Sequence, residues 1–210
     1  MSKFMNEPPD EIKYQFKIIL LGDGGVGKTC LTNRFCFNEF NINTRLTIGL
    51  AFNTYSINGL ENGKPIKIGA AIWDFGGQER FRPLIPQFIA GAHGAILTYE
   101  SVVVKSLVNL HSQWAPLLEK YTGDIPRILV GTKYDLSEDS QIITKEMIQE
   151  YQEKLTCQEH FLTSSKTGHN VKNVFFEVLE KIIEKEYPDV KLIRDKEETL
   201  LKNRLKQREK

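Results

Sequence analysis

One eight-residue stretch, Gly22-Asp23-Gly24-Gly25-Val26-Gly27-Lys28-Thr29, constrains this 210-residue chain more than any other. It matches G-x-x-x-x-G-K-[ST], the pattern of a phosphate-binding loop. An apolar run, residues 16–21, precedes it, and a helix-like segment follows it. Glycines let backbone N–H groups turn toward phosphate oxygens, and a helix presents its positive end to an anion. The stretch therefore predicts a nucleoside triphosphate site, with Lys28 on the β- and γ-phosphates and the Thr29 hydroxyl on Mg²⁺.

The composition is that of an ordinary globular domain. Hydrophobic residues make up 40% of the chain and charged residues 26%, and the net charge is +1. So small a net charge favours neither a nucleic acid nor an anionic membrane as partner. Cys30, Cys36 and Cys157 form no C-x-x-C pair, which favours reduced thiols in a cytoplasmic protein over a disulfide or zinc framework. We expect a monomer without a membrane-spanning segment, since no run approaches about 20 apolar residues.

Strand-like and helix-like segments alternate between residues 14 and 187. The predicted strands are residues 16–21, 50–57, 66–73, 94–99, 125–132 and 161–164, and the predicted helices are 27–37, 106–121, 144–155 and 171–187. Such alternation predicts an α/β domain, in which helices cover both faces of a mostly parallel sheet. Turn-forming Asn-Gly pairs at 58–59 and 62–63 predict an antiparallel hairpin between the second and third strands. The predicted sheet thus has six strands, one of them antiparallel.

The sequence also predicts a helix kink, a helix cap and the character of the two chain ends. Pro116 is expected to kink its helix, and Thr144 to cap the helix that follows it. Residues 1–13 are predicted to be a flexible lead, and residues 188–210 a charged tail, helical or disordered. We expect the tail to be solvated, or to make a weak membrane contact through its five basic residues, Lys202, Arg204, Lys206, Arg208 and Lys210.

A second chemical motif closes the third predicted strand, at Trp73-Asp74-Phe75-Gly76-Gly77-Gln78-Glu79. A carboxylate in this place holds Mg²⁺ through water in phosphoryl-transfer sites, so Asp74 is a predicted metal ligand. The Gly77 N–H would reach the γ-phosphate, and Gln78 would orient the attacking water. The alternative for Asp74 is an ordinary strand-end cap.

Two further motifs follow later strands and bear on the base. In Thr132-Lys133-Tyr134-Asp135, the Asp135 carboxylate could accept from guanine N1–H and the 2-amino group, a pair of donors that adenine lacks. The Lys133 stem would pack on the face of the base. In Ser164-Ser165-Lys166, the Ser165 N–H would face the guanine O6. Either of these two base-site motifs alone is usually a solvated turn. The specific signal is the order of all four motifs: the phosphate loop, the Asp74 motif and the two base-site motifs.

With these four motifs in this order, residues 14–187 resemble the Ras superfamily of small GTPases, most closely its Rab branch. The resemblance implies a three-layer G domain that binds GTP and GDP with Mg²⁺. It implies that Thr47, in Thr47-Ile48-Gly49 of a first switch segment, joins Mg²⁺ and the γ-phosphate, and that Phe40 stacks on guanine. Implied nucleotide-binding residues are Gly24, Gly25, Val26, Gly27, Lys28, Thr29, Cys30, Phe40, Thr47, Gly77, Thr132, Lys133, Asp135, Ser164, Ser165 and Lys166.

The resemblance also implies partner proteins. Effectors would read the switch segments, and GTPase-activating and nucleotide-exchange proteins would act on the nucleotide, in membrane trafficking or cytoskeletal regulation. Phe52, Trp73 and Phe88 fall on the aromatic trio that Rab proteins show to effectors, although core packing explains them equally well. No inserted domain supplies an arginine in cis, so we expect Gln78 and Lys28 to catalyse slow hydrolysis, which a partner's arginine would accelerate.

The sequence departs from the Rab pattern at three places. Gly76 stands where Ras and Rab proteins have alanine, as in the Arf branch. Thr132 replaces the commoner asparagine, as in the Rho branch, and lacks its amide contact. Residues 202–210 contain no cysteine for a lipid anchor. Two other functions remain open: a module that holds GTP without hydrolysing it, and a metabolic kinase, for whose lid Arg80 and Arg82 alone do not suffice.

Overall fold

The computed structural model describes residues 10–136 and 142–194. Its strands are β1 (Ile12–Leu21), β2 (Leu50–Glu61), β3 (Lys64–Phe75), β4 (Gly94–Glu100), β5 (Arg127–Thr132), β6 (Glu159–Leu162) and β7 (Val190–Leu192). Its α-helices are α1 (Lys28–Phe37), α2 (Ile85–Ile89), α3 (Val104–Asn109), α4 (Ala115–Thr122), α5 (Lys145–Lys154) and α6 (Val171–Glu186). Three short helical segments complete the list: η1 (Glu79–Leu84) and η3 (Tyr134–Leu136) are 3₁₀ turns, and η2 (Leu110–Trp114) is a π-helical turn.

The strands form one sheet in the order β6-β5-β4-β1-β3-β2-β7. Strands β1, β3, β4, β5 and β6 run parallel, so their carboxyl ends meet at one edge. That edge is where a ligand binds in sheets of this type. The predicted hairpin is confirmed, because β2 and β3 pair antiparallel from Leu50↔Phe75 to Glu61↔Lys64. Asn62 and Gly63 form its turn with positive φ angles of 49° and 75°, the requirement of a type I′ turn.

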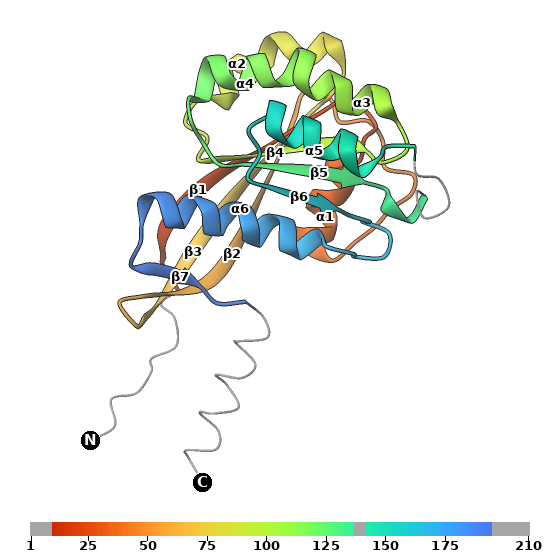
Figure 1. The fold of residues 1–210 in the computed structure, drawn as a ribbon. Coiled ribbons are helices and arrows are strands. Elements are labelled where there is room, and N and C mark those ends of the chain that lie inside the picture. The colour runs from red at the N-terminus through yellow and green to blue at the C-terminus, as the bar shows by residue number, and fades with distance from the viewer. Residues whose placement is uncertain (1–9, 137–141, 195–210) are drawn as a thin grey trace, which may run out of the picture.

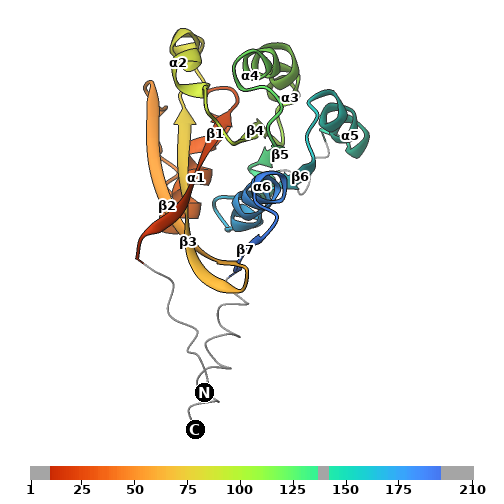
Figure 2. The same ribbon diagram turned by 90° about the vertical axis from the view of Figure 1, so that its left-hand side faces the viewer.

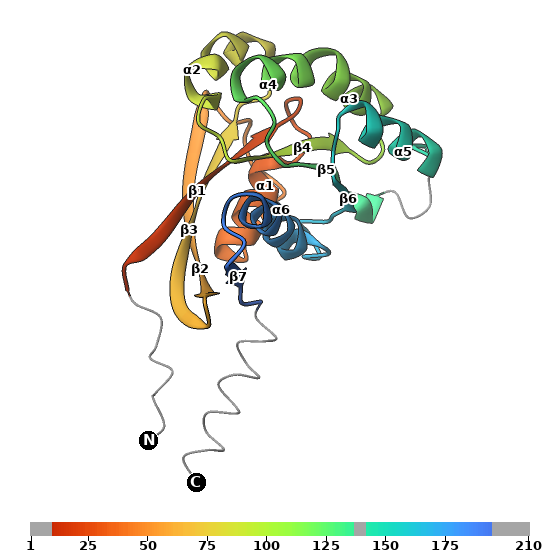
Figure 3. The same ribbon diagram turned by 60° about the vertical axis from the view of Figure 1, so that its left-hand side comes forward.

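Helices cover both faces of the sheet, as predicted (Figures 1 and 3). One apolar core, which includes Leu31, Phe35 and Phe175, lies between the sheet and helices α1 and α6. The other, which includes Leu107, Trp114 and Leu155, lies under α2, α3, α4 and α5. The fold is thus a three-layer α/β domain whose two cores hold the ligand edge of the sheet in place.

The prediction of six strands is wrong by one strand. β7 lies within the predicted tail and pairs antiparallel with β2, so the described sheet has seven strands and two antiparallel pairs. Figure 2 shows β7 beside the turn end of the long β2–β3 hairpin. Val190 and Leu192 are only 5% and 9% exposed, so apolar burial draws this piece of chain onto the sheet. The five basic tail residues, and residues 1–9 of the lead, lie outside the described residues.

Other boundaries also differ from the prediction. The last core strand, β6, is Glu159–Leu162 rather than residues 161–164. Residues 79–89, which lie outside the predicted strands and helices, form η1 and α2. The Thr144 cap is confirmed, since its hydroxyl accepts the Met147 N–H at 3.3 Å. The kink at Pro116 takes the form of the π-helical turn η2 between α3 and α4.

No helix among residues 10–136 and 142–194 is long and apolar enough to cross a bilayer.

Candidate functional site

The loop between β1 and α1 is shaped by glycine. Gly25 and Gly27 have φ angles of 82° and 105°, which residues with a side chain rarely adopt, and Gly27 is the N-cap of α1. The Lys28 ammonium turns back under the loop and donates to the carbonyls of Gly22 (2.7 Å) and Asp23 (2.8 Å). Burial lowers the pKa of Lys28 to about 8, and nearby Asp74 and Asp23 oppose that shift. The geometry places a buried cation beneath backbone amides at a helix start, which is an anion site.

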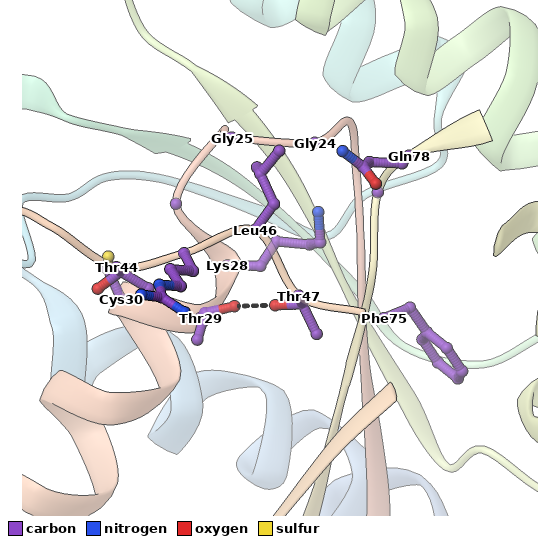
Figure 4. Close-up of a pocket in the computed structure, with 13 residues that line it drawn as sticks. Gly24, Gly25, Lys28, Thr29, Cys30, Thr44, Leu46, Thr47, Phe75 and Gln78 are labelled. Carbon is purple, nitrogen blue, oxygen red and sulfur yellow. Dashed lines mark hydrogen bonds between the residues drawn. The ribbon is translucent and has the colours of Figure 1, made fainter. Parts of the chain in front are cut away.

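Three oxygen-bearing side chains converge beside this loop. The hydroxyls of Thr29 and Thr47 are 2.7 Å apart (Figure 4). Thr29 also donates to Asp74 Oδ2. Asp74 is only 1% exposed, and its other oxygen, Oδ1, has no hydrogen-bond partner among the described residues. Burial raises the pKa of Asp74 against hydrogen bonds from Thr29 and Thr47 and the charge of Lys28. A buried carboxylate oxygen that lacks a partner, beside two hydroxyls, fits a hard cation such as Mg²⁺.

The segment after β3 packs against the loop at van der Waals distance. A Cβ atom built on Gly24 would lie 3.4 Å from Gln78 Cγ, and one on Gly77 would lie 2.3 Å from the Asp23 carbonyl carbon. Figure 4 shows Gln78 beside Gly24. A Cβ on Gly76 would lie 2.6 Å from the Thr47 carbonyl oxygen, while the Gly76 N–H donates to Gly49 at 2.8 Å. Glycine at position 76 therefore lets the first and second switch segments touch.

These segments line a pocket of about 70 Å³. Its lining includes most of the predicted phosphate-contacting residues, namely Gly24, Gly25, Gly27, Lys28, Thr29, Cys30, Thr47, Gly77 and Gln78, and it adds Thr44, Arg45, Leu46 and Phe75. Val26 is buried and is not part of this lining. The structure thus brings together residues from the phosphate loop, the first switch and the second switch.

A second pocket, of about 320 Å³, adjoins the first through Gly25, Gly27, Cys30 and Thr44. Its lining includes the predicted base-site residues Phe40, Thr132, Lys133, Asp135, Ser165 and Lys166. Ser164 donates to Asp135 Oδ1 at 2.6 Å, and the Lys166 ammonium is 4.0 Å from Oδ2. The Lys133 ammonium is held by Glu100 at 2.8 Å. The Asp135 carboxylate is therefore fixed in orientation on the wall of this pocket.

The two pockets are tied together by hydrogen bonds. The Thr132 hydroxyl lies within hydrogen-bond distance of the Val26 carbonyl and is 3.0 Å from the Tyr99 carbonyl. It therefore connects the base-site loop to the phosphate loop. Arg34, on α1, donates to the carbonyls of Ser165 (2.7 Å) and Lys166 (2.6 Å). Sequence reasoning missed Arg34, because its partners lie 131 and 132 residues further along the chain.

Sequence reasoning also missed the contacts of Asp23. Its carboxylate accepts from the Trp114 indole (2.9 Å) and from Asn109 (2.6 Å), and its Oδ1 is 3.9 Å from the Arg82 guanidinium. Arg82 also lies over the Trp114 ring, 5.2 Å from its centroid. These four residues, which we call the Asp23 clasp, connect the phosphate loop, the second switch and the helix after β4.

The aromatic trio forms a continuous patch. Phe52 meets Trp73 edge-on with ring centroids 5.3 Å apart, and Trp73 lies 6.1 Å from Phe88. Phe52 is 53% exposed, whereas Trp73 and Phe88 are half-buried against the second core. Core packing therefore accounts for part of Trp73 and Phe88 but does not account for Phe52.

Comparison with known proteins decides the family. Residues 17–184 match the Ras family model. The chain belongs to the Ras family. This small GTPase lies near the Rab branch: it is 39% identical over 175 residues to Ras-related protein Rab11E of Lotus japonicus, covering 82% of this chain and 77% of that protein. It is 37% identical over 180 residues to Rab-19 of Xenopus laevis (83% and 79%), and 36% identical over 175 residues to human Rab-8B (82% and 80%).

Proposed function

We propose that this chain is a molecular switch that binds GTP and GDP together with Mg²⁺ and hydrolyses GTP slowly on its own. The observation that supports this most is the meeting of Thr29, Thr47 and Asp74, because it joins the phosphate loop, the first switch and the end of β3 at one point. A ligand that binds there would contact the phosphate loop, the first switch and the end of β3 together. Loss of the γ-phosphate would therefore release Thr47 and Gly77, and the switch segments would relax.

Lys28, Gln78 and the residues that would hold Mg²⁺ have separate roles in the proposed hydrolysis. The Lys28 ammonium donates to the carbonyls of Gly22 and Asp23. Its remaining N–H would donate to phosphate oxygens, and the loop amides would hold the phosphates in place. Gln78 orients a water molecule for in-line attack on the γ-phosphorus, in the space that Gly24 and Gly25 leave open. When bound, Mg²⁺ would be held by Thr29, Thr47 and, through water, Asp74, and would neutralise phosphate charge.

Guanine selection follows from the fixed carboxylate of Asp135. It would accept from N1–H and the 2-amino group of guanine, whereas adenine would leave it unpaired against the N1 lone pair. The Ser165 N–H would donate to O6, and Phe40 and the Lys133 stem would cover the faces of the base, since all of these residues line one pocket. Arg34 would hold the Ser165–Lys166 backbone in position from the side of α1.

The output of the switch would be read by other proteins. The exposed ring of Phe52, contiguous with Trp73 and Phe88 and close in sequence to the first switch, is the surface we propose for effectors. Nucleotide-exchange and GTPase-activating proteins would set the rates of switching. Its similarity to Rab proteins supports a role in membrane trafficking.

The test is selective nucleotide binding. The purified protein should release GDP or GTP on denaturation, identified by chromatography, and ATP instead would overturn the assignment. The Asp135→Asn variant should lose most of its affinity for GDP and gain affinity for xanthosine diphosphate, because an amide can donate to the O2 of xanthine. If the variant still prefers GDP, Asp135 does not select the base.

The alternative, a module that holds GTP without hydrolysing it, differs in one measurement. A single turnover of GTP-loaded protein releases phosphate only if the chain hydrolyses GTP. The lack of side chains at Gly24 and Gly25 favours hydrolysis. A Cβ at position 24 would lie 3.4 Å from Cγ of Gln78, the residue proposed to orient the water. No phosphate release over many hours would instead support the binding module.

A further inference from the structure

The phosphate pocket carries more positive charge than the phosphate loop alone supplies. Its described lining holds two cations, Lys28 and Arg45, and no carboxylate. Lys28 belongs to the loop motif, whereas Arg45 comes from the first switch, where no motif calls for an arginine. Asp74 and Asp23 lie near Lys28 and offset part of its charge, whereas no hydrogen bond or ion pair among the described residues offsets the charge of Arg45. A cation left in this state in a concave site attracts a polyanion.

Arg45 differs from the other arginines near the site, because each of those already has a partner. Arg80 donates to Gln78 Oε1 at 2.9 Å, and Arg82 belongs to the Asp23 clasp. Arg34 is committed to the backbone of Ser165 and Lys166. Arg45 makes no hydrogen bond or ion pair with any residue that the structure describes, and its side chain is exposed. Its guanidinium is therefore available to a ligand in the pocket.

The position of Arg45 along the chain links it to the switch. It lies two residues before Thr47, whose hydroxyl meets Thr29. Leu46, between them, reaches the phosphate loop, with its Cδ2 at 4.0 Å from a Cβ built on Gly25. Figure 4 shows Thr44, Leu46 and Thr47 on one stretch of chain that crosses the loop. Arg45 thus lines the pocket when this segment is closed, and any opening of the segment would carry Arg45 away with Thr47.

We propose that Arg45 is a catalytic residue that the first switch supplies in cis: it contacts the bound triphosphate and stabilises the charge that develops during GTP hydrolysis. This inference rests on the proposed function. As water attacks, an O–P bond to the γ-phosphorus forms and the bond to the β–γ bridging oxygen breaks, which leaves negative charge on the β-phosphate of GDP. Both protons of the water leave with the released inorganic phosphate. Arg45 donates hydrogen bonds to phosphate oxygens that gain charge, and it neither gives nor takes a proton. Under this proposal the first switch itself, rather than an inserted domain, supplies an arginine in cis.

The experiment compares single-turnover hydrolysis by the full chain loaded with GTP and Mg²⁺. Arg45→Ala should slow the rate constant about tenfold, less than a fully enclosed arginine finger contributes, because Arg45 is exposed to solvent. Arg45→Lys should recover part of the rate, since lysine keeps the charge but loses the planar fork of donors. Asn43→Ala, an exposed neighbour outside both pocket linings, is the matched control and should hydrolyse GTP at the wild-type rate.

A second readout isolates the transition state. GDP-loaded wild-type protein should bind aluminium fluoride, a mimic of the transferring phosphoryl group, and ¹⁹F NMR should show weaker binding to Arg45→Ala. Unchanged hydrolysis and fluoride binding in Arg45→Ala, with GTP still bound, would overturn the proposal and leave the proposed function intact. A variant that only loses affinity for GTP would also overturn it, since Arg45 would then be a binding residue. A wild-type chain that binds no guanine nucleotide would overturn both.

Discussion

At the scale of single residues, His160 makes stability depend on pH. It lies in β6, and its Nε2 is 2.9 Å from the hydroxyl of Tyr99 in β4, across β5. Burial lowers the pKa of His160 to about 4, below its ordinary value of about 6.5. The folded protein therefore binds fewer protons than the unfolded chain between these two values. Stability contributed by the neutral ring is complete above the upper value and is lost as the pH falls toward the lower one.

We predict that His160→Gln flattens this dependence, because glutamine can still pair with Tyr99 but does not titrate. From about pH 6.5 down to about pH 4, the free energy of unfolding of the wild type should fall more steeply than that of the variant, by up to about 1.4 kcal/mol per pH unit. Urea unfolding at several pH values measures both curves. Curves that stay parallel throughout this range would rule out the role of His160.

The residues of the candidate site fall into two groups according to what the sequence could predict. Lys28, Thr29, Asp74 and Asp135 were predictable, because phosphate, metal and base chemistry demand those residue types directly after strands. Arg34 was not, since its role is set by a contact with Ser165 that only the packing of α1 creates. Asp23 and Trp114 were missed for the same reason, because no local pattern marks their contact across the fold. Arg45 was missed because only the folded first switch brings it to the lining of the phosphate pocket.

At the scale of elements, the π-helical turn η2 builds the Asp23 clasp. In an α-helix, residues three or four apart share a face, whereas i→i+5 bonding aligns residues five apart. The Ala115 N–H bonds to the Leu110 carbonyl in this way, and both Asn109 and Trp114 reach Asp23. Pro116 favours the turn, since it lacks an N–H and its ring crowds the carbonyl four residues earlier. The sequence predicted a kink at Pro116 but not its use, because Trp114 also fits the apolar spacing of a core residue.

We predict that Trp114→Phe accelerates release of GDP about tenfold. The change removes the indole N–H from Asp23 while it keeps an aromatic ring in the core, and a hydrogen bond to a charged group contributes roughly 1.5–3 kcal/mol. The phosphate loop would then be held less firmly. The dissociation of a fluorescent GDP analogue into excess GDP measures the rate.

Ser112→Ala provides the control for Trp114→Phe. Ser112 lies on the same π-helical turn, but its hydroxyl bonds only within the helix, to the Val108 carbonyl at 3.2 Å. Its release rate should equal that of the wild type. Equal rates in Trp114→Phe and the wild type would show that the clasp does not hold the loop.

At the scale of the whole molecule, β7 fastens the chain after α6 to the hairpin end of β2. Gly59, Leu60 and Glu61 pair with Leu192, Lys191 and Val190, and the Ile193 N–H donates to Asn58 at 2.9 Å. A Cβ on Gly59 would lie 2.9 Å from the Lys191 carbonyl oxygen, so glycine permits the close approach. The sequence did not predict this strand, because three residues amid charged chain are too few for a periodic signal. Leu50, where β2 leaves the switch, is roughly 36 Å from Glu61 along the strand.

That separation makes β7 a stabilising element that should not affect nucleotide chemistry. Leu192→Ala should lower the free energy of unfolding by about 2 kcal/mol, the lower end for a buried leucine, because the strand lies at the sheet edge. Lys191→Ala, whose side chain points to solvent from the same strand, should change it by less than about 0.5 kcal/mol. Both variants should hydrolyse GTP at the wild-type rate in single-turnover assays. If Leu192→Ala instead altered hydrolysis while Lys191→Ala did not, the end of the hairpin would be coupled to the switch along β2.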